Sequence, residues 1–568
     1  MEEPHMVVTI NATAPGFSCP QHANAWSAKL PQNEDCLFLN VYTPVSALTA
    51  YPAAPVPVMV FIHGGGFVFG SASDPFIGGE GLIPEGVVLV TMNYRMGPFG
   101  FLSIPELPDT NFGLGDQLLA LRWVQRHIRS FGGDPSRVTL FGQSAGGMSA
   151  LWLATNAAVV EASVADRERL FDAVILQSAS VPVLYTSEAD AHLAAAEFAA
   201  ALGCADAADR LACMRSVETV TLSDSYENLF RHRDVFPHTG VPVHIKGIAS
   251  PHPHGPWVYP SDALAAGGLD PRVRFMVGTT AHEFYLMITS VFPFLDPETE
   301  LIEPLLRSAF EHHMDEEEIH HLLHHYHITA DESTRTSTRL ASVANDLYMQ
   351  CYTRNLALEL NRVSSHPVYK YIYDHEAING IRGFGAFHGA ELPFVFGTTP
   401  GGMIFPGLFT EEERALSKEM TSAWSSFAKQ AGSPRVGWPA FESHNEESLV
   451  FSPQPHVVRH YKQELCQFWE KIYPRMELRF TEGDDEMLHE SMLSLIVNRY
   501  FFRLMIYVSR LTIWTLITVC VSLLAVLFFT CYRCCCRRPS CLASASATNP
   551  GNAKQAKKNA KSKKKKKD

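Results

Sequence analysis

The pentapeptide at residues 142–146, GQSAG, fits the pattern G-x-S-x-G, in which a serine can act as a nucleophile. It follows an apolar, β-prone run at 137–141 and precedes a stretch of small and apolar residues, which indicates a turn from a strand into a helix. On such a turn the Ser144 hydroxyl would project above the strand, and the Ala145 N–H would point to where an oxyanion forms. A glycine-rich turn with a capping serine would give the same five residues.

A second stretch could supply more donors to an oxyanion. Residues 56–63 indicate a buried strand that leads into Gly64-Gly65-Gly66-Phe67, an HGGG pattern. Consecutive glycines let the main chain approach closely, so the N–H groups of Gly65 and Gly66 could hold developing charge. The order strand, HGGGF, strand, helix and G-x-S-x-G argues against a merely flexible glycine loop.

The residues between these motifs predict the elements that position them. We expect a strand-like run at 7–13 and a helix at 113–130 between two strands. Further helices are expected at 188–202 and from Thr410, which forms a capping box with Glu413, to about 431. Strands are expected at 56–63, 87–93, 137–141, 173–176 and 273–277. This alternation predicts a largely parallel sheet with helices on its faces.

The surroundings of the motifs resemble the type-B carboxylesterase and cholinesterase family. Residues 34–42 (EDCLFLNVY) and 141–147 (FGQSAGG) are similar to two family signatures, and the matches GLGDQ, ALRWV and FGGDP lie between them. The resemblance extends from about residue 7 to about 475. It implies an α/β-hydrolase with a central, mostly parallel sheet flanked by helices, and a Ser-Glu-His triad that needs no cofactor and no metal.

A serine nucleophile needs a histidine to take its proton and a carboxylate to orient that histidine. Residues 277–284 (VGTTAHEF) resemble the family segment that carries the acid, which implies Glu283, and 387–397 (FHGAELPFVFG) resemble the segment with the base, which implies His388. Ser178 resembles a serine that supports the acid, and Glu391 an adjacent structural acid. Phe284 stands where cholinesterases have glycine, so its backbone must avoid positive φ or accept strain.

The resemblance also implies a set of disulfides. Six cysteines precede residue 511, and the family pattern pairs Cys19 with Cys36, Cys204 with Cys213, and Cys351 with Cys466. These bonds would require an oxidising compartment. The alternative is six free thiols in a cytosolic enzyme.

Three residues are candidates for substrate binding. Trp26 lies in the first predicted disulfide loop, where cholinesterases hold a quaternary ammonium by cation–π contact. Gln143 replaces the glutamate that cholinesterases carry before the nucleophile, which removes a negative charge. Phe67 lies beside the glycine run. The positions after the acid, 284–287 (FYLM), do not reproduce the cholinesterase pattern. Together with Gln143 they favour a general carboxylesterase with an apolar pocket over a cholinesterase. Trp26 packed under its loop is the alternative.

The C-terminal region differs in character from the rest. Residues 511–532 contain no charge and are long enough to span a bilayer as a helix. The residues from Cys531 onward carry nine Lys and three Arg against Asp568, a net charge of +11, whereas the whole chain carries −13. We therefore expect a hydrolase domain at 1–475, an acidic stalk at 476–510, a span at 511–532 and a cytoplasmic tail at 533–568, with the hydrolase domain lumenal or extracellular.

The tail and the N-terminus carry further signals. Cys531 and Cys534–Cys536 are expected sites of palmitoylation. The lysines are expected to contact anionic lipid rather than nucleic acid. The dilysine end resembles a signal for retrieval to the endoplasmic reticulum, so we expect the protein in the endoplasmic reticulum or at the cell surface. Asn11 is the acceptor of an N-x-T sequon. No signal peptide precedes it, so we expect an incomplete N-terminus, with a cytosolic tail-anchored protein as the alternative.

Histidines at 320–327 could bind a metal but fit a solvated helix face better.

Two functions compete. The first is a membrane-tethered serine carboxylesterase that forms an acyl-enzyme on Ser144. The second is a cell-surface adhesion protein similar to neuroligins, in which the hydrolase fold is idle. The presence of Ser144, Glu283 and His388 together favours the enzyme. The sequence predicts a small-molecule ester as the substrate and makes no prediction of the oligomeric state.

Overall fold

The computed structural model describes residues 11–480, apart from 22–29, 50–53, 108–109, 180–186, 234–250, 292–302, 304–305, 308–309, 311–312, 327–335, 379–382, 400–407 and 430–433. Its strands form one sheet. They are β1 (Leu39–Tyr42), β2 (Val56–Ile62), β3 (Val88–Met92), β4 (Gly133–Gln143), β5 (Ala173–Gln177), β6 (Arg274–Thr280), β7 (Tyr369–Tyr373), β8 (Ser448–Phe451) and β9 (His456–Val458).

The sheet has nine strands in the order β1-β3-β2-β4-β5-β6-β7-β8-β9. β1 runs antiparallel to β3 and β9 antiparallel to β8, while every pairing between β3 and β8 is parallel. The predicted mostly parallel sheet is confirmed. β4 begins four residues earlier than predicted, because Gly133 pairs with Val56 beyond an irregularity in the β2–β4 register.

The helices of the described residues cover both faces of the sheet. They are α1 (Val45–Thr49), α2 (Gly97–Phe101), α3 (Phe112–His127), the 3-10 helix η1 (Ile128–Phe131), α4 (Ala145–Thr155), α5 (Ala157–Val164), α6 (Glu188–Ala201), α7 (Arg210–Arg215), α8 (Thr219–Arg233), α9 (Pro260–Ala265), α10 (Tyr285–Val291), α12 (Glu316–His325), α13 (Thr336–Asn345), the π-helix η5 (Asp346–Gln350), α14 (Cys351–Val363), α15 (Leu392–Phe396), α16 (Glu411–Ala428) and α17 (Gln463–Phe480).

Three of the predicted helices are present with adjusted ends. The helix expected at 113–130 is α3 followed by η1, which ends where Gly132 takes a left-handed conformation with φ of 82°. The helix expected at 188–202 is α6. The predicted capping box of α16 is confirmed, because Thr410 Oγ1 accepts from Glu413 N and Glu413 Oε2 accepts from Thr410 N. The strand-like run at 7–13 lies partly outside the described residues, and its described part, 11–13, is not a strand.

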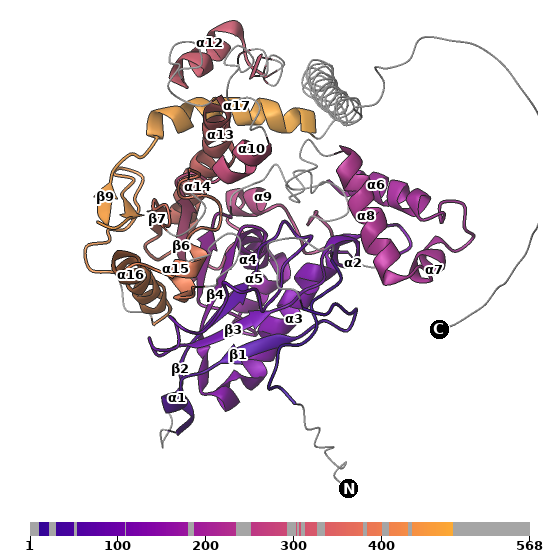
Figure 1. The fold of residues 1–568 in the computed structure, drawn as a ribbon, viewed down its shortest axis with the longest axis horizontal. Helices are drawn as coiled ribbons and strands as arrows, with labels where there is room; N and C mark the ends of the chain where they lie inside the picture. Colours follow the sequence, from indigo (N-terminus) through magenta and orange to yellow (C-terminus); the bar gives the residue numbers. More distant parts are fainter. Residues whose placement is uncertain are drawn as a thin grey trace, which may run out of the picture. The chain divides into compact units, whose positions relative to one another are not determined.

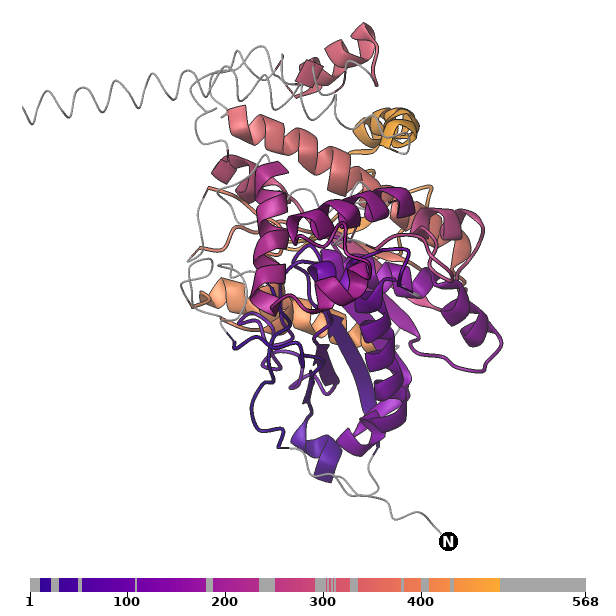
Figure 2. The same ribbon diagram turned by 90° about the vertical axis from the view of Figure 1, so that its right-hand side faces the viewer.

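The alternation of side chains along β2 explains the two layers of helices. Val58, Val60 and Ile62 belong to a core cluster shared with α3 and α4, whereas Met59 and Phe61 belong to a cluster shared with α15 and α16. Successive side chains of a strand point to opposite faces, so an apolar run of this kind needs helices on both sides. Figures 1 and 2 show α16 on one side of the sheet and α3 and α4 on the other.

Three disulfides join the cysteine pairs that the family resemblance implied. They link Cys19 to Cys36, Cys204 to Cys213, and Cys351 to Cys466. The last bridge connects α14 to α17, which packs with α12 and η5 around the buried Trp469 in a third core cluster. This bridge closes the longest of the three disulfide loops, with its cysteines 115 residues apart in the sequence, near the C-terminal end of the described residues.

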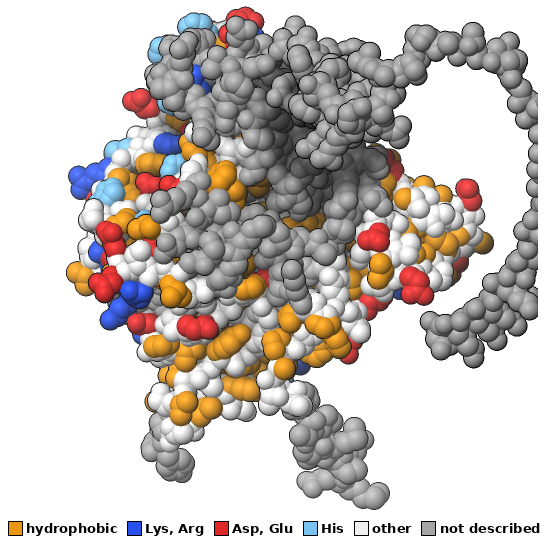
Figure 3. Space-filling model, in the orientation of Figure 1, with side chains coloured by type: hydrophobic (Ala, Val, Ile, Leu, Met, Phe, Trp, Pro, Cys, Tyr) orange, Lys and Arg blue, Asp and Glu red, His pale blue; other side chains and the backbone are white. Residues whose placement is uncertain are grey.

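The chain divides into two compact units, residues 1–492 and 493–568, and the second lies outside the described residues. The predicted span at 511–532 and the tail at 533–568 lie outside the described residues. Within the part that is described, no helix combines the length and the low charge that crossing a bilayer requires. On the face drawn in Figure 3, the basic side chains of the first unit lie mainly at the left, and hydrophobic side chains predominate in the lower part.

Candidate active site

The candidate catalytic residues follow the carboxyl ends of parallel strands. Ser144 comes directly after β4, Glu283 three residues after β6, and His388 in the loop between β7 and α15. The glycine run Gly64–Gly66 follows β2. Because the carboxyl ends of parallel strands share one edge of a sheet, side chains up to 244 residues apart in the sequence, Ser144 and His388, arrive at the same edge as the glycine run.

The backbone of Ser144 has the strained conformation that a nucleophile on a strand-to-helix turn requires. Its φ is 57° and its ψ is −127°, outside the regions that a serine ordinarily adopts. The turn is held because Ser144 N donates to Gln177 O at the end of β5, at 2.8 Å. Strain of this kind costs on the order of 1–3 kcal/mol and persists only where the surrounding structure enforces it.

The glycines of the motif make this turn possible. A Cβ on Gly142 would lie 2.3 Å from Gly146 O, and a Cβ on Gly146 would lie 2.0 Å from Ile62 O. Both contacts are far below van der Waals distance and involve backbone atoms, which cannot swing away. The small residues therefore allow α4 to start directly against β2 and β4.

The predicted oxyanion donors are available. Among the described residues, the N–H groups of Gly65, Gly66 and Ala145 have no hydrogen-bond acceptor. Gly65 and Gly66 have φ of 103° and 61°, and their loop is closed by Val68 N and Phe69 N, which both donate to Gly65 O. Unpaired N–H groups at a helix start and in a glycine loop are the donors that a tetrahedral oxyanion needs.

His63 supports the same loop. Its ring stacks on Tyr94 with centroids 4.5 Å apart, and its Nδ1 lies 2.8 Å from Gly64 O. Burial lowers the pKa of His63 to about 4, against a smaller opposing contribution from the contact with Gly64 O. A carbonyl oxygen only accepts, so the neutral ring donates its Nδ1 proton and fixes the start of the glycine run.

Glu283 and His388 are directly bonded. Oε2 of Glu283 lies 2.5 Å from Nδ1 of His388, and His388 N donates to Glu283 O at 3.3 Å. The Glu283 side chain has no exposed surface, whereas the imidazole is one quarter exposed. The other carboxylate oxygen, Oε1, accepts from the Ser178 hydroxyl at 2.6 Å and from Thr280 N at 2.8 Å. This arrangement fixes the imidazole orientation and leaves Nε2 directed away from the acid.

The predicted difficulty at Phe284 does not arise. Phe284 is not among the described residues with positive φ, and its ring packs 5.9 Å from that of Tyr348. A larger side chain than glycine is therefore accommodated after the acid without backbone strain.

The carboxylates around His388 raise the pKa of its imidazole. Burial by itself lowers the pKa of His388, but the charge of Glu283, its hydrogen bond and the charge of Glu391 outweigh burial, so the pKa is raised above 6.5. Glu391 is itself fully buried. Burial, followed by the charge of Glu283, raises its pKa to about 7.

Gln143 joins the nucleophile turn to the histidine loop. Its Nε2 lies 3.2 Å from Nε2 of His388, and a Cβ on Gly389 would lie 3.7 Å from the same amide nitrogen. A Cβ on Gly64 would lie 2.9 Å from Gln143 Oε1 and 3.1 Å from Ser144 Cβ. The glycine run, the G-x-S-x-G turn and the histidine loop therefore meet around this one side chain.

The remaining predicted site residues have different positions. Trp26 lies outside the described residues. The Phe67 ring is fully buried and packs against Phe101 at 5.2 Å, so its role in substrate binding stays a prediction. Asn11 is exposed, and its Oδ1 accepts from the Thr13 hydroxyl at 2.7 Å. The described residues contain no group of three metal-binding side chains, and His327 lies outside them.

Two residues at the site were not predicted from the sequence. Asn345 Oδ1 accepts from Glu283 N at 2.9 Å, and Gln350 Nε2 donates to Thr280 O at 2.7 Å. They lie 62 and 70 residues from their partners, in a segment without a recognisable motif. The only nearby signal is Cys351, whose predicted disulfide places this segment against the C-terminal helix.

Comparison with known proteins identifies the family. The sequence profile of the carboxylesterase family matches residues 3–469. The chain belongs to the carboxylesterase family. Para-nitrobenzyl esterase of Bacillus subtilis (strain 168) is 32% identical to this carboxylesterase-family protein over 488 residues, which cover 82% of this chain and 89% of the relative. Human cocaine esterase is 32% identical over 469 residues, covering 80% and 78% of the two chains. Acetylcholinesterase of Bungarus fasciatus is 29% identical over 501 residues, covering 84% and 78%.

Solved structures agree with the fold. A PNB esterase structure superposes with a TM-score of 0.66 at 28% identity, covering 81% of this chain and 89% of the other. A structure described as a thermophylic PNB esterase gives a TM-score of 0.65 at 28% identity, with 80% and 88% covered. This carboxylesterase-family protein therefore has the expected α/β-hydrolase fold, and its relatives are ester hydrolases.

Proposed function

We propose that this protein is a serine carboxylesterase that hydrolyses carboxylic esters through an acyl-enzyme on Ser144. The observation that carries the proposal is the 2.5 Å contact between Glu283 and His388. The imidazole in turn lies 3.2 Å from the side chain of Gln143, the residue before the strained turn at Ser144. An idle hydrolase fold has no need of a buried carboxylate that is aligned on a partly exposed imidazole.

In the first half of the reaction, Ser144 Oγ attacks the ester carbonyl carbon while His388 Nε2 takes its proton. The carbonyl oxygen becomes an oxyanion that accepts hydrogen bonds from Gly65 N, Gly66 N and Ala145 N. Glu283 stabilises the imidazolium through Nδ1. The tetrahedral intermediate then collapses, the bond to the alcohol oxygen breaks, and His388 gives its proton to the departing alcohol.

In the second half, water replaces the alcohol. His388 takes a proton from the water, whose oxygen attacks the acyl carbon, and the same three N–H groups hold the second oxyanion. Breaking the bond to Ser144 Oγ releases the carboxylic acid, and Ser144 regains its proton from His388. The cycle consumes one water molecule and uses only these side chains and main-chain donors.

The substrate is an uncharged ester with apolar groups. Gln143 is neutral and lies against His388, so no carboxylate at this position attracts a cationic alcohol. Two relatives are described as para-nitrobenzyl and cocaine esterases, names that fit bulky esters with an aromatic group, and the para-nitrobenzyl group is uncharged. Choline esters are the weaker alternative, to which the acetylcholinesterase likeness points.

Labelling of the purified full-length chain under non-reducing conditions tests the proposal. We expect a fluorophosphonate probe to modify Ser144 and short p-nitrophenyl esters to be hydrolysed. Ser144→Ala should lose both, whereas Ser136→Ala, an exposed serine on the Asp134 turn, should keep both. A folded, unlabelled wild-type protein would support the adhesion alternative instead.

We also propose that the enzyme is tethered to a membrane by residues 511–532, with the hydrolase domain lumenal or extracellular, the stalk at 476–510, and the basic tail at 533–568 cytoplasmic. The charge asymmetry supports this topology. The six paired cysteines support an oxidising location of the hydrolase domain. In this topology Asn11 is open to glycosylation and Cys531 and Cys534–Cys536 to palmitoylation.

Glycan removal tests the topology. When the full chain is made in cells, an endoglycosidase should increase its electrophoretic mobility, and Asn11→Gln should abolish that change. An unglycosylated protein whose ectodomain cysteines react with a thiol reagent in the cytosol would overturn the assignment.

A further inference from the structure

A π-helical turn lies beside the loop that carries the catalytic acid. η5, residues 346–350, interrupts the helical run between α13 and α14. Single π turns inside helices are rare and concentrate at functional sites. The residues at the two edges of this turn, Asn345 and Gln350, are each 2% exposed and both contact the segment from Thr279 to Glu283.

Four hydrogen bonds connect the two residues to that segment. Asn345 Oδ1 accepts from Glu283 N at 2.9 Å, and its Nδ2 donates to Ala281 O at 3.2 Å. Gln350 Nε2 donates to Thr280 O at 2.7 Å, and its Oε1 accepts from the Thr279 hydroxyl at 3.0 Å. The backbone is thus held both before the acid and at the acid itself.

The π turn explains how two residues five positions apart act on one loop. In an α-helix, side chains three and four positions apart are neighbours, and a residue five positions away points elsewhere. A π turn bonds residue i to residue i+5 and so brings these two positions onto one face. A regular α-helix through 345–350 would present only one of the two amides to the loop.

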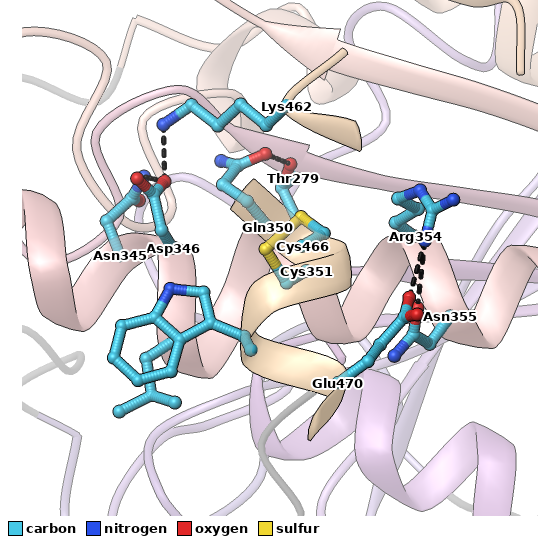
Figure 4. Close-up of a disulfide and its surroundings, with 12 residues drawn as sticks. Thr279, Asn345, Asp346, Gln350, Cys351, Arg354, Asn355, Lys462, Cys466 and Glu470 are labelled. Carbon is cyan, nitrogen blue, oxygen red and sulfur yellow. Dashed lines mark hydrogen bonds and ion pairs between the residues drawn. A yellow bond between two sulfur atoms is a disulfide. The ribbon is translucent and has the colours of Figure 1, made fainter. Parts of the chain in front are cut away.

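The turn is anchored on its far side. Cys351, the residue after Gln350, is bonded to Cys466 on α17, and Lys462 forms an ion pair with Asp346, the first residue of η5 (Figure 4). Asp346 also accepts from the Tyr326 hydroxyl at 3.1 Å. A covalent bond and an ion pair therefore fix the π turn against α17. We call the two amide side chains that this turn presents, those of Asn345 and Gln350, the clamp.

We propose that Asn345 and Gln350 are positioning residues of the esterase, which hold Glu283 against His388 through the π turn η5. This inference rests on the proposed function, since it assigns a second layer to the proposed triad. The two residues touch neither substrate nor the reacting atoms. They act on the reaction by fixing where the acid lies.

A positioning role differs from a purely structural one in what it changes. If Glu283 is released, the imidazolium loses its partner, so kcat falls while substrate binding persists and KM does not change. The pKa of His388 also falls toward its ordinary value, because Glu283 and Glu391 are the acidic groups that raise it. The acidic limb of the kcat/KM profile therefore moves to lower pH.

The experiment compares Gln350→Met with Gln125→Met in the full-length protein. Gln125 lies on a different helix, α3, and its Nε2 donates to two backbone carbonyls outside the triad, Pro135 O at 2.9 Å and Leu170 O at 3.0 Å. Both substitutions keep the side-chain length and remove the polar contacts. We expect Gln350→Met to lower kcat on p-nitrophenyl esters about 10- to 100-fold with KM unchanged, and Gln125→Met to leave kcat as in the wild type.

Thr279→Val is the milder variant if Gln350→Met folds poorly. It keeps the shape and removes the hydroxyl that orients Gln350, so we expect a smaller loss of kcat. Because Thr279 acts through Gln350, its substitution should have no further effect in the Gln350→Met background. Equal kcat for Gln350→Met, Thr279→Val and Gln125→Met would overturn the proposal.

A readout without turnover separates this inference from the proposed function. The proton that His388 Nδ1 donates to Glu283 should give a far-downfield proton NMR signal in the wild type, and Gln350→Met should weaken or shift it. If the wild type neither hydrolyses esters nor labels at Ser144, the proposed function fails while this signal still tests the clamp. An unchanged signal in Gln350→Met would overturn the clamp even in an active enzyme.

Discussion

The side-chain amide of Gln143 lies 3.2 Å from Nε2 of His388, the ring nitrogen that Glu283 leaves free. An amide nitrogen only donates, so this contact is a hydrogen bond when Nε2 is an unprotonated acceptor and Nδ1 carries the proton toward Glu283. That tautomer is the one a general base needs. Gln143 therefore holds the base in its working form and must give way when Nε2 takes the proton of Ser144.

Gln143→Glu should change both the pH profile and the substrate preference. A carboxylate beside His388 raises the pKa of the imidazole further, and the base is active only when neutral, so the acidic limb of kcat/KM should move up by about one pH unit. Hydrolysis of choline esters should increase relative to uncharged esters of the same acyl group. Profiles measured side by side for the wild type and the variant check both expectations, and an unmoved limb would show that Gln143 does not face the base.

Loss of the hydrogen bonds around Glu283 should reduce turnover in steps. Glu283→Gln should lower kcat about 10⁴-fold, because the amide no longer stabilises the imidazolium.

Ser178→Ala should lower kcat about 10-fold, since the hydroxyl bonded to Glu283 at 2.6 Å is removed and an interaction with a charged group contributes about 1.5–3 kcal/mol. Steady-state kinetics on p-nitrophenyl esters measures both.

Ser163→Ala is the matched control for Ser178→Ala. Its buried hydroxyl also donates to a carboxylate, Asp270, at 2.6 Å, but the pair lies outside the site. Both serine variants should lose comparable thermal stability, and only Ser178→Ala should lose turnover. A similar kcat for the two would mean that Ser178 has no role beyond stability.

Glu391→Gln should alter the dependence of stability on pH. Burial and the charge of Glu283 raise the pKa of Glu391 to about 7, so its folded-state stabilisation is complete below pH 4.5 and is lost as the pH rises through about 7. The loss is about 3 kcal/mol at pH 8 in the wild type. The variant has no proton to lose, so its Tm relative to the wild type should rise between pH 4.5 and pH 8. A constant difference across this range would contradict the raised pKa.

Gly146→Ala should destabilise the protein and lower activity. Its Cβ would lie 2.0 Å from Ile62 O, so either α4 or β2 must move, at a cost of about 1–3 kcal/mol or more, and the Ser144 turn moves with it. The matched control is Gly115→Ala in α3, where a Cβ meets nothing within 4 Å. This substitution should stabilise the folded protein by about 0.5–1 kcal/mol. Thermal unfolding and probe labelling of both variants provide the test.

Much of the fold could be predicted because its signals are local. The buried runs of β2 to β6 and the capping box of α16 depend on neighbouring residues, and they were recognised with ends shifted by a few positions. β7 was missed, since Lys370 interrupts its apolar pattern. That lysine is buried in the structure, where Nζ lies 3.3 Å from the Ser448 hydroxyl on β8. The compensation for its burial comes from a residue 78 positions away, which no local pattern can show.

The sequence by itself determined which residues are available for ester hydrolysis. The G-x-S-x-G turn, the glycine run after β2 and the segments around Glu283 and His388 each have a short-range signature, because each depends on a strand end and on the residues beside it. Only the tertiary structure decided which partners surround the acid and the base. Gln143 against His388, and Asn345 and Gln350 against the loop of Glu283, are contacts between segments tens to hundreds of residues apart. Such contacts exist only once the sheet has aligned its strand ends and a π turn has placed two amides on one face.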